Sequence, residues 1–521
     1  MQALEPKISG TRDYFGDDIV ALRDARDAID ATLQCYGYAT IDPPILERPS
    51  PFLDRSGEDI RRRMYIFPDP AGREVCLRPE LTIPACRAYL RQLKSSTGEE
   101  QLSPEREARL SYFGPAFRYE STSEGRYRQF YQVGAELIGA KRREAADAEI
   151  LSVALEGLEA AGLQSPMVEI GDFGILDAFI SQLSIGERAK VRLHRLALRN
   201  RKEERFLSAA AAAEANNTDV PSEFSELASL LASVGPQHAE SLVKEVLALA
   251  DVRHVGGRGP DEIVERLIGR ATQQPESIST DAMQGVLDLL NIRAEPPKAF
   301  HLVREHFRKF GSTAADSILE RCEDRLRLFS MYRKSPLPLQ FNVGLRRGLE
   351  YYTGFVFEIF AKGYEPIGHV CGGGRYDNLL EALGANLSIP AVGFGIGLDR
   401  LLVALSGSRT PGSCESNVPR AIVVSAGDVR QEECIRISVA LRNAGWTVET
   451  ETSGRRARSV LSYALKRKIP YVVFVGEEEL KNNQVRIKRL DDRNDELIAF
   501  SALEAYAKRE SAAADRQGHK P

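Results

Sequence analysis

Residues 117–139 read FRYESTSEGRYRQFYQVGAELIG. Three arginines, three glutamates and two glutamines lie among the apolar residues of this stretch, and buried strands rarely carry so many charges. Side chains of an extended chain alternate between two faces, so Arg118 and Glu120 are expected on one face, and so are Arg126 and Arg128. A solvated hairpin whose charges keep a sheet edge soluble is the simplest interpretation of such a stretch. The remaining sequence favours a binding site.

The size and composition of the chain indicate a multidomain globular enzyme. With 521 residues it exceeds what one hydrophobic core usually organises, so two or three domains are expected. Hydrophobic residues make up 43% and charged residues 28%, as in typical globular proteins. The net charge of −4 excludes a global basic field, so any contact with nucleic acid must come from local patches.

The cysteines and the first residues point to the cytoplasm. The seven cysteines lack C-x-x-C spacing and are odd in number, which predicts reduced thiols and neither zinc ligands nor a disulfide framework. The opening MQALEPKISGTRDYFG has no basic segment followed by an apolar one, and no apolar run reaches about 18 residues. We therefore expect a cytoplasmic protein without a membrane partner.

The first four hundred residues alternate between helical and extended patterns. Helical spacing over residues 17–37 is followed by an extended segment, and helical spacing returns over residues 145–161. Between them, turn residues separate short extended runs, which favours an antiparallel sheet; these runs cover residues 64–67, 74–77, 110–119 and 129–138. Residues 175–335 are mostly helical in pattern and predict an insertion. Beyond it, strands at residues 339–344 and 355–361 and a helix at residues 396–405 complete a core formed by residues 1–174 and 336–405.

The last hundred residues have a different pattern. Residues 406–418, SGSRTPGSCESNV, predict a linker. Strands and helices alternate over residues 419–505, which predicts a parallel sheet covered on both faces. Residues 420–500 hold 15 Lys and Arg against 12 Asp and Glu, a mildly basic balance that suits an RNA partner or simply a solvated helix. Residues 506–521 are small and polar and predict a disordered tail.

Several arginines lie beside glycines or aromatic residues. The planar, permanently charged guanidinium binds phosphate at two points, so arginines directed into one site suit a polyphosphate substrate. The candidates are Arg118, Arg126, Arg347, Arg375 and Arg400. The glycine run at residues 372–374 would let a flat ligand approach the backbone, although such a run more often marks a bulge.

Spaced blocks of the sequence resemble class II aminoacyl-tRNA synthetases, and in particular the histidyl-tRNA synthetase family. Residues 10–14 (GTRDY) are similar to the family's N-terminal segment, residues 36–46 to motif 1, residues 117–136 to motif 2 and residues 393–400 to motif 3. Two further blocks are peculiar to the histidine enzymes: residues 347–354 (RGLEYYTG) and residues 373–377 (GGRYD).

The resemblance implies an α+β fold: a class II antiparallel sheet flanked by helices, with a helical insertion and a C-terminal α/β anticodon-binding-like domain. It implies a histidine–tRNA ligase that activates histidine with ATP to histidyl-adenylate and transfers it to tRNA(His). Mg²⁺ would accompany ATP as part of the substrate, without a protein metal site or a prosthetic group. Motif 1 would form a homodimer contact.

The resemblance also implies roles for individual residues. Arg118 and Arg400 would bind ATP phosphates and Glu120 the nucleotide, with Arg126 and Arg375 completing the ATP site. Arg347 would lie between the histidine carboxylate and the α-phosphate, so that Arg347 and Arg118 stabilise the charge that gathers in the transition state. The histidine-binding residues would be Glu80, Thr82 and Gln132 for the amino group, and Glu136, Tyr351 and Tyr352 for the ring. Strand packing is the plain alternative for the Tyr351–Tyr352 pair.

Two departures keep alternatives open. Residues 51–63, 77–84 and 170–174 look more like the non-catalytic regulatory subunit of ATP phosphoribosyltransferase, whose partner would be the catalytic subunit of that enzyme. The arginines of motifs 2 and 3 and the C-terminal domain favour the ligase. A stand-alone histidine sensor or RNA-binding protein is a third interpretation. The second departure is the motif 2 loop, Ser121–Thr122–Ser123–Glu124, which places an acidic residue where the family carries basic or amide residues facing the acceptor end of tRNA.

Overall fold

A computed structural model describes residues 7–53, 61–97, 107–199, 241, 245, 278–333, 337–345, 351–364, 367–406, 419–427, 429, 431–491 and 494–518. The chain divides into two compact units, residues 1–409 and 410–521. The division falls inside the segment 406–418, where the sequence predicted a linker.

A large mixed sheet organises the first unit. Among the described residues, nine strands form it in the order β1-β5-β6-β12-β11-β10-β7-β9-β8. The pairs β1–β5 and β7–β9 are parallel and the others antiparallel. The strands are β1 (Ala39–Ile41), β5 (Ala108–Phe117), β6 (Gln129–Ile138), β7 (Pro166–Asp172), β8 (Arg293–Ala294), β9 (Leu339–Asn342), β10 (Phe355–Ala361), β11 (Cys371–Arg375) and β12 (Ala391–Gly397).

Helices cover one face of this sheet and enclose the main hydrophobic core. Helix α1 (Asp17–Cys35) buries Leu22, Ala25, Ile29 and Leu33, spaced three to four residues apart on one face. It packs on α5 (Arg143–Ala160), which lies against the central strands and is itself covered by α14 (Asp316–Tyr332). Helix α16 (Leu398–Ser406) begins directly after β12, so the helix expected at residues 396–405 starts two residues later.

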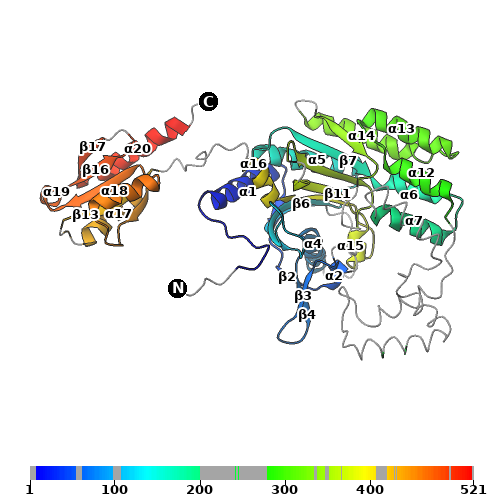
Figure 1. Cartoon of the computed structure of the whole chain (residues 1–521), viewed down its shortest axis with the longest axis horizontal. Helices are drawn as coiled ribbons and strands as arrows, with labels where there is room; N and C mark the ends of the chain where they lie inside the picture. The colour runs from blue at the N-terminus through cyan, green and yellow to red at the C-terminus, as the bar shows by residue number, and fades with distance from the viewer. Residues whose placement is uncertain are drawn as a thin grey trace. The chain divides into compact units, whose positions relative to one another are not determined.

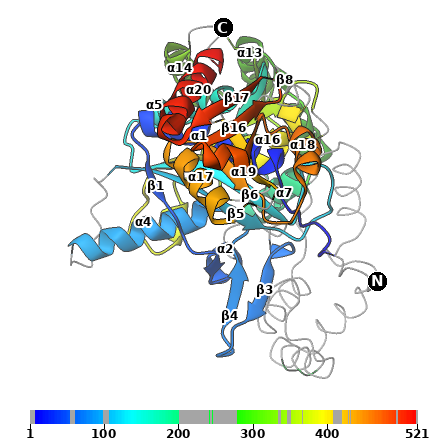
Figure 2. The ribbon, with the colours of Figure 1, turned by 90° about the vertical axis from the view of Figure 1, so that its left-hand side faces the viewer.

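The other side of the large sheet carries a smaller hydrophobic core. It is formed with α4 (Thr82–Thr97), α2 (Ser50–Leu53) and α15 (Leu379–Ala382). A three-stranded antiparallel sheet, β2 (Leu46–Glu47), β4 (Glu74–Leu77) and β3 (Tyr65–Pro68), projects on this side, and Figures 1 and 2 show it away from α5 and α14.

The described part of the expected insertion packs against the core. It contains α6 (Phe173–Gln182), α7 (Glu187–Arg199), α12 (Thr280–Leu290), α13 (Pro296–Lys309) and α14. Strand β8 lies within it and pairs with β9, so this part joins the large sheet. Most of residues 200–277 lie outside the described residues, and the boundaries 175–335 stay a prediction.

The second unit is a five-stranded sheet with helices on both faces. Its described strand order is β14-β13-β15-β16-β17. The elements are β13 (Arg420–Ala426), α17 (Gln431–Asn443), β14 (Thr447–Thr450), α18 (Ala457–Lys466), β15 (Tyr471–Gly476), α19 (Glu477–Lys481), β16 (Gln484–Arg489), β17 (Asp495–Ala499), the 3₁₀ turn η3 (Phe500–Ala502) and α20 (Leu503–Gly518). The first three strands are parallel, as expected, but β16 and β17 are antiparallel and make the sheet mixed.

Helix α20 corrects the expectation of a disordered tail from residue 506. Leu503, Tyr506 and Ala507 are buried in the core of the second unit. The indole Nε1 of Trp446 donates to the Ala507 carbonyl oxygen (2.9 Å), and Tyr471 donates to Glu510 (3.0 Å). A composition rich in alanine and charge therefore forms a helix here because tertiary contacts anchor its first turns.

None of the helices in the described part of the chain combines the length and the apolar content needed to cross a membrane.

Candidate functional site

Strand β6 carries the polar side chains of the site on one face only. Val133, Ala135 and Leu137 point into the core beneath α5, while Gln132 and Glu136 point to the opposite side. The strict alternation of a strand thus places two polar side chains beside a hydrophobic core without burying them in it. This outcome fits the interpretation of residues 117–139 as a site.

Glycines on the neighbouring strands make room for these side chains. Gly393 of β12 lies opposite Glu136, and a Cβ at Gly393 would come within 1.6 Å of the Glu136 carboxylate. A Cβ at Gly395 would come within 2.1 Å of the Gln132 side-chain nitrogen, and one at Gly134 within 2.4 Å of the Tyr112 hydroxyl. The motif 3 glycines therefore shape the pocket in which motif 2 side chains lie.

Glu136 is fully buried at the centre of a hydroxyl cluster. Tyr112 of β5 donates to one carboxylate oxygen (2.9 Å), and Tyr376 donates to the other. Burial raises the pKa of Glu136 to about 8, against the opposing effect of these hydroxyl groups. The rings of Tyr376 and Tyr352 lie 5.6 and 4.9 Å from that of Tyr351, between ring centres.

Glu80 and Thr82 reach the same pocket from the start of α4. The Glu80 carboxylate accepts hydrogen bonds from the backbone amides of Thr82 (2.7 Å) and Ile83 (2.8 Å), as a cap of the helix. Burial raises the pKa of Glu80, and the nearby Arg118 opposes that shift. The Thr82 hydroxyl lies 3.4 Å from that of Tyr112. The structure therefore brings Glu80, Thr82 and Glu136 together.

One polar atom of the pocket has no partner in the part of the chain that the structure describes. The side-chain oxygen of Gln132 is buried and accepts no hydrogen bond there. A buried acceptor without a partner costs about 1–3 kcal/mol. A ligand that donates a proton at this point, such as an ammonium group, would remove that cost.

The arginines of motif 2 and motif 3 gather beside this pocket. Arg118 donates to the Pro79 carbonyl oxygen (2.7 Å), next to Glu80. Glu120 accepts from Arg126 (2.6 Å) and from Arg63 (3.3 Å). A Cβ at Gly125, in the loop between β5 and β6, would come within 3.3 Å of the Arg400 Cα.

Arg400 is surrounded by like charges. Burial lowers its pKa, and the positive charges of Arg126 and Arg118 lower it further while Glu120 raises it. Glu358 raises it as well, so three guanidinium groups lie near two carboxylates here, and such a group of arginines suits an anionic ligand such as a polyphosphate.

The loop that joins β5 to β6 corrects one local expectation. The strands end at Phe117 and begin at Gln129, so residues 118–128 do not alternate as a regular strand. Arg126 pairs with Glu120, whereas the Arg128 guanidinium lies 4.1 Å from the Tyr119 ring centre and donates to the Ser9 carbonyl oxygen. Arg126 and Arg128 thus have different partners, and both follow the turn at Gly125 (φ 69°).

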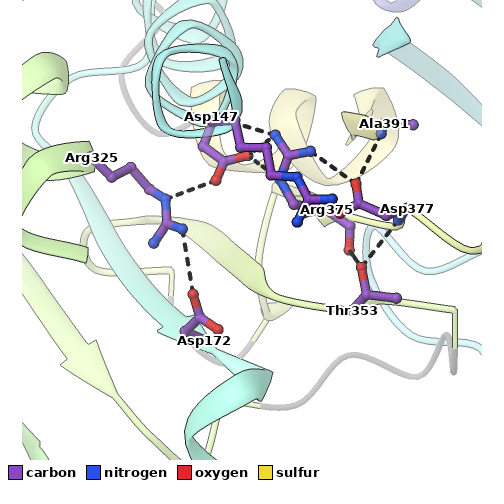
Figure 3. A network of polar contacts seen from close by, with 8 residues as sticks. Asp147, Asp172, Arg325, Thr353, Arg375, Asp377 and Ala391 are labelled. Carbon is purple, nitrogen blue, oxygen red and sulfur yellow. Dashed lines mark hydrogen bonds and ion pairs between the residues drawn. The ribbon is translucent and has the colours of Figure 1, made fainter. Parts of the chain in front are cut away.

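Arg347 and Arg375 were also expected in the site. Arg347, with residues 346–350, lies outside the described residues. Arg375 lies in a buried ionic network, where its guanidinium binds Asp147 (2.6 Å) and Asp377 (2.9 Å) and donates to the Arg143 carbonyl oxygen (3.0 Å) (Figure 3). ATP binding by Arg375 stays a prediction, and these contacts give its guanidinium another role.

Sequence reasoning missed three side chains of the site. Tyr112 was visible only as an apolar position of β5, opposite Gly134. Tyr376 lies in the GGRYD block but was given no role, and Arg63, which joins Glu120, lies in a stretch compared with the regulatory subunit. The pairing of Tyr112 with Gly134 across β5 and β6 would have indicated a role for Tyr112, but it can be recognised only when the strand register is known.

The described residues contain no group of three or more His, Cys, Asp or Glu side chains placed to hold a metal ion. The expectation that Mg²⁺ has no protein cage stays a prediction.

Comparison with known families extends over nearly the whole chain. The histidyl-tRNA synthetase family model matches residues 10–255 and 267–401, and the anticodon binding domain model matches residues 420–510. A histidine–tRNA ligase of Methanocaldococcus jannaschii is 30% identical over 501 residues, covering 95% of this chain and 98% of the relative. That of Pyrococcus furiosus is 27% identical and covers 96% and 98%.

Solved structures share the fold at lower identity. A histidyl-tRNA synthetase from Nostoc sp. PCC 7120 matches with a TM-score of 0.63 and 20% identity, covering 98% of this chain and all of the other. A Bacillus halodurans protein described as an ATP phosphoribosyltransferase regulatory subunit/histidyl-tRNA synthetase matches with a TM-score of 0.59 and 20% identity, covering 91% and 99%.

The large sheet, its motif 2 and motif 3 strands and the C-terminal unit together define the class II aminoacyl-tRNA synthetase fold, as expected. Within that class, the chain belongs to the histidyl-tRNA synthetase family. The likeness to the B. halodurans protein shows the fold alone, and no comparison favours the regulatory-subunit interpretation over the ligase.

Proposed function

We propose that this chain is a histidine–tRNA ligase, which activates histidine with ATP and transfers it to tRNA(His). The observation that carries this proposal is the buried Glu136 pocket beside the cluster of Arg118, Arg126 and Arg400. A polar pocket next to an anion site is what joining an amino acid to ATP requires. Membership of the family supports the same activity.

Histidine would bind with its ring towards Glu136 and its ammonium group towards Glu80. The ring nitrogens of histidine need an acceptor and a donor, and the Glu136 carboxylate would accept from the ring N–H. Tyr351 and Tyr352 would frame the ring. Thr82 and the unbonded oxygen of Gln132 would receive the ammonium group. A pocket of this kind rejects analogues strongly, because an unmatched ligand leaves buried polar groups unpaired.

The first chemical step requires positioning and charge stabilisation. A carboxylate oxygen of histidine attacks the α-phosphorus of ATP, and the bond from that phosphorus to the bridging oxygen breaks as pyrophosphate leaves. Negative charge gathers on the phosphoryl oxygens, and fixed guanidinium groups stabilise this transition state more than the ground state. By family position, Arg118 and Arg347 would act at the α-phosphate. Arg126, Arg400 and Glu120 would hold the nucleotide, with Mg²⁺ bound to ATP.

The second step brings tRNA to the adenylate. A terminal ribose hydroxyl attacks the histidyl carbonyl carbon, and AMP leaves. The C-terminal unit would bind the anticodon region, which its family match and mildly basic sequence support. In the loop Ser121–Glu124, this chain carries an acidic residue where the resemblance implies basic or amide residues that face the acceptor end of tRNA.

A homodimer in the cytoplasm is also proposed. Ile45 and Leu46, in the motif 1 segment, are 41% and 56% exposed, and apolar side chains in such a position suit a subunit contact. The scattered free cysteines fit a reducing compartment.

The test is exchange of labelled pyrophosphate into ATP by the purified protein. Exchange is expected only when histidine is present, together with charging of tRNA with histidine. Arg118→Ala should lower the exchange rate by about 100-fold or more. Arg327→Ala removes an exposed arginine that pairs only one turn away with Asp324, and should leave the rate unchanged. Absent exchange, with stimulation of an ATP phosphoribosyltransferase catalytic subunit, would contradict the proposal.

A further inference from the structure

In the first unit, oppositely charged side chains form a buried aspartate–arginine network (Figure 3). Its centre is Asp147 of α5, which has no exposed surface. One oxygen of Asp147 accepts from the Arg375 Nε (2.9 Å), and the other accepts from the Arg325 Nε (2.9 Å). Asp147 thus joins a core strand, through Arg375, to α14 of the expected helical insertion, through Arg325. The members of the network are Asp147, Asp172, Arg325, Arg375 and Asp377.

Arg325 is enclosed on every side. Its guanidinium also pairs with Asp172 (3.4 Å), donates to the Cys322 sulfur (3.5 Å) and lies 4.5 Å from the Phe355 ring centre. The residue is 6% exposed. Taking arginine and aspartate out of water is costly, and an apolar cluster of equal volume often stabilises a fold as well or better. A gain in fold stability is therefore a weak explanation for this network. Holding the neighbouring backbone in one geometry is a sufficient explanation.

The network holds the segment 351–354 from two sides. On one side, the Arg375 carbonyl oxygen accepts from the Thr353 backbone amide (2.8 Å), and the Thr353 hydroxyl accepts from the Asp377 backbone amide (3.1 Å). On the other side, the Gly354 carbonyl oxygen accepts from the Phe173 amide (3.0 Å), one residue after Asp172. Each of these hydrogen bonds to the segment comes from a charged residue of the network or from a residue next to one.

The same segment carries the tyrosines of the pocket. Tyr351 and Tyr352 directly precede Thr353, and Tyr376, which donates to Glu136, lies between Arg375 and Asp377. Three pocket residues therefore belong to backbone that the network holds. A shift of this backbone would move the rings towards or away from bound histidine.

We propose that Arg325 is a positioning residue for the histidine pocket, because it completes the network that holds residues 351–354. Without its guanidinium, Asp147 and Asp172 lose their shared counter-charge and repel each other across the core. The backbone at Thr353 and Gly354 loses its fixed frame, and the tyrosine rings no longer meet the imidazole in one arrangement. This inference rests on the proposed function, since it concerns the same histidine site.

The test compares substrate binding in the Arg325→Met variant and the unmodified protein. The Michaelis constant for histidine in pyrophosphate exchange should rise at least tenfold, while that for ATP changes less than twofold. Arg333→Met is the matched control: Arg333 lies directly after α14, and its guanidinium pairs with a different carboxylate of α5, that of Glu159 (2.7 Å), which is not a member of the network. It should change neither constant. Arg325→Lys should restore part of the histidine affinity.

Thr353→Val keeps every buried charge and removes only the hydroxyl, with its contacts to the Asp377 amide and the Arg375 carbonyl oxygen, so this variant is used if Arg325→Met does not fold. It should raise the histidine constant selectively, to a smaller extent. The inference would be overturned if the Michaelis constants for histidine and ATP changed equally. It would also be overturned if the constant for histidine stayed the same while the active fraction of the protein fell, because either result shows a merely structural role. If the unmodified protein shows no histidine-dependent exchange, the proposed function fails first. If it is active and only the variants show no selective effect, the inference alone fails.

Discussion

Glu136 shows how one side chain sets the chemistry of the pocket. Its carboxyl group has a pKa of about 8, chiefly because burial disfavours the charge. At neutral pH this group is therefore mostly protonated. An imidazole N–H that donates to it favours the ionised form, so binding histidine at this pH releases a proton.

This release predicts the pH dependence of histidine affinity. Between pH 7 and pH 9 the ionised fraction of Glu136 rises from about 10% to about 90%, so affinity should rise several-fold across this range. The glutamine in Glu136→Gln does not titrate, and its affinity should lack this increase. Calorimetric titration at several pH values measures both, and the ratio of the two proteins cancels the titration of histidine's own amino group. Parallel pH profiles would contradict the assignment of Glu136.

At the scale of elements, the loop between β5 and β6, which belongs to motif 2, contacts Arg400 of motif 3. Its backbone is held at several points: the Arg118 amide donates to the Arg128 carbonyl (2.8 Å), and the Tyr119 amide donates to the Arg63 carbonyl (2.7 Å). At its turn, Gly125 has a φ of 69° and lies against the backbone of Arg400. The loop and the start of α16 therefore fix each other's position.

Two glycine substitutions separate this contact from backbone strain. Gly125→Ala should raise the Michaelis constant for ATP about tenfold or more, because the new methyl group meets Arg400. Gly72→Ala, in the turn between β3 and β4, has a comparable φ of 78° but no atom within 4 Å of the new methyl group. Both should lose about 1 kcal/mol of stability from left-handed strain. ATP constants that change equally in the two variants would refute the loop contact.

At the scale of the whole molecule, the two units have separate hydrophobic cores. The first surrounds the large sheet, and the second lies between the five-stranded sheet and its helices. The residues proposed for the activation step belong to the first unit, whereas the anticodon-binding match falls in the second. Chemistry and tRNA recognition are thus assigned to different units.

A truncated chain tests this assignment. Residues 1–406 should retain histidine-dependent pyrophosphate exchange within a few-fold of the full chain, because the site lies in that unit. Charging of tRNA should fall by about 100-fold or more, through weaker tRNA binding. Filter binding and aminoacylation assays measure the two effects. Loss of exchange in a truncated protein that still unfolds cooperatively would show that activation needs the second unit.

Local patterns of the sequence determined most elements and the placing of the motifs. Strands β6 and β10 were predicted with the bounds they have, and α1 was predicted within a few residues. The motif blocks predicted the class II fold before any strand order was known. These features are local: helical spacing, alternation and turn residues act within a few positions of the chain.

Tertiary structure decided what local patterns do not contain. The glycines beside Arg375 predicted a phosphate ligand, which stays a prediction, whereas the contact of its guanidinium with Asp147, 228 positions away, appears only in the folded chain. Tyr112 entered the pocket through strand register, and α20 formed because the core of the second unit holds its first turns. The antiparallel pairing of β16 and β17 likewise depended on partners distant from each residue's own neighbours. Burial and ion pairing act between residues far apart in the chain, so only the folded arrangement selects among the roles that each residue could take.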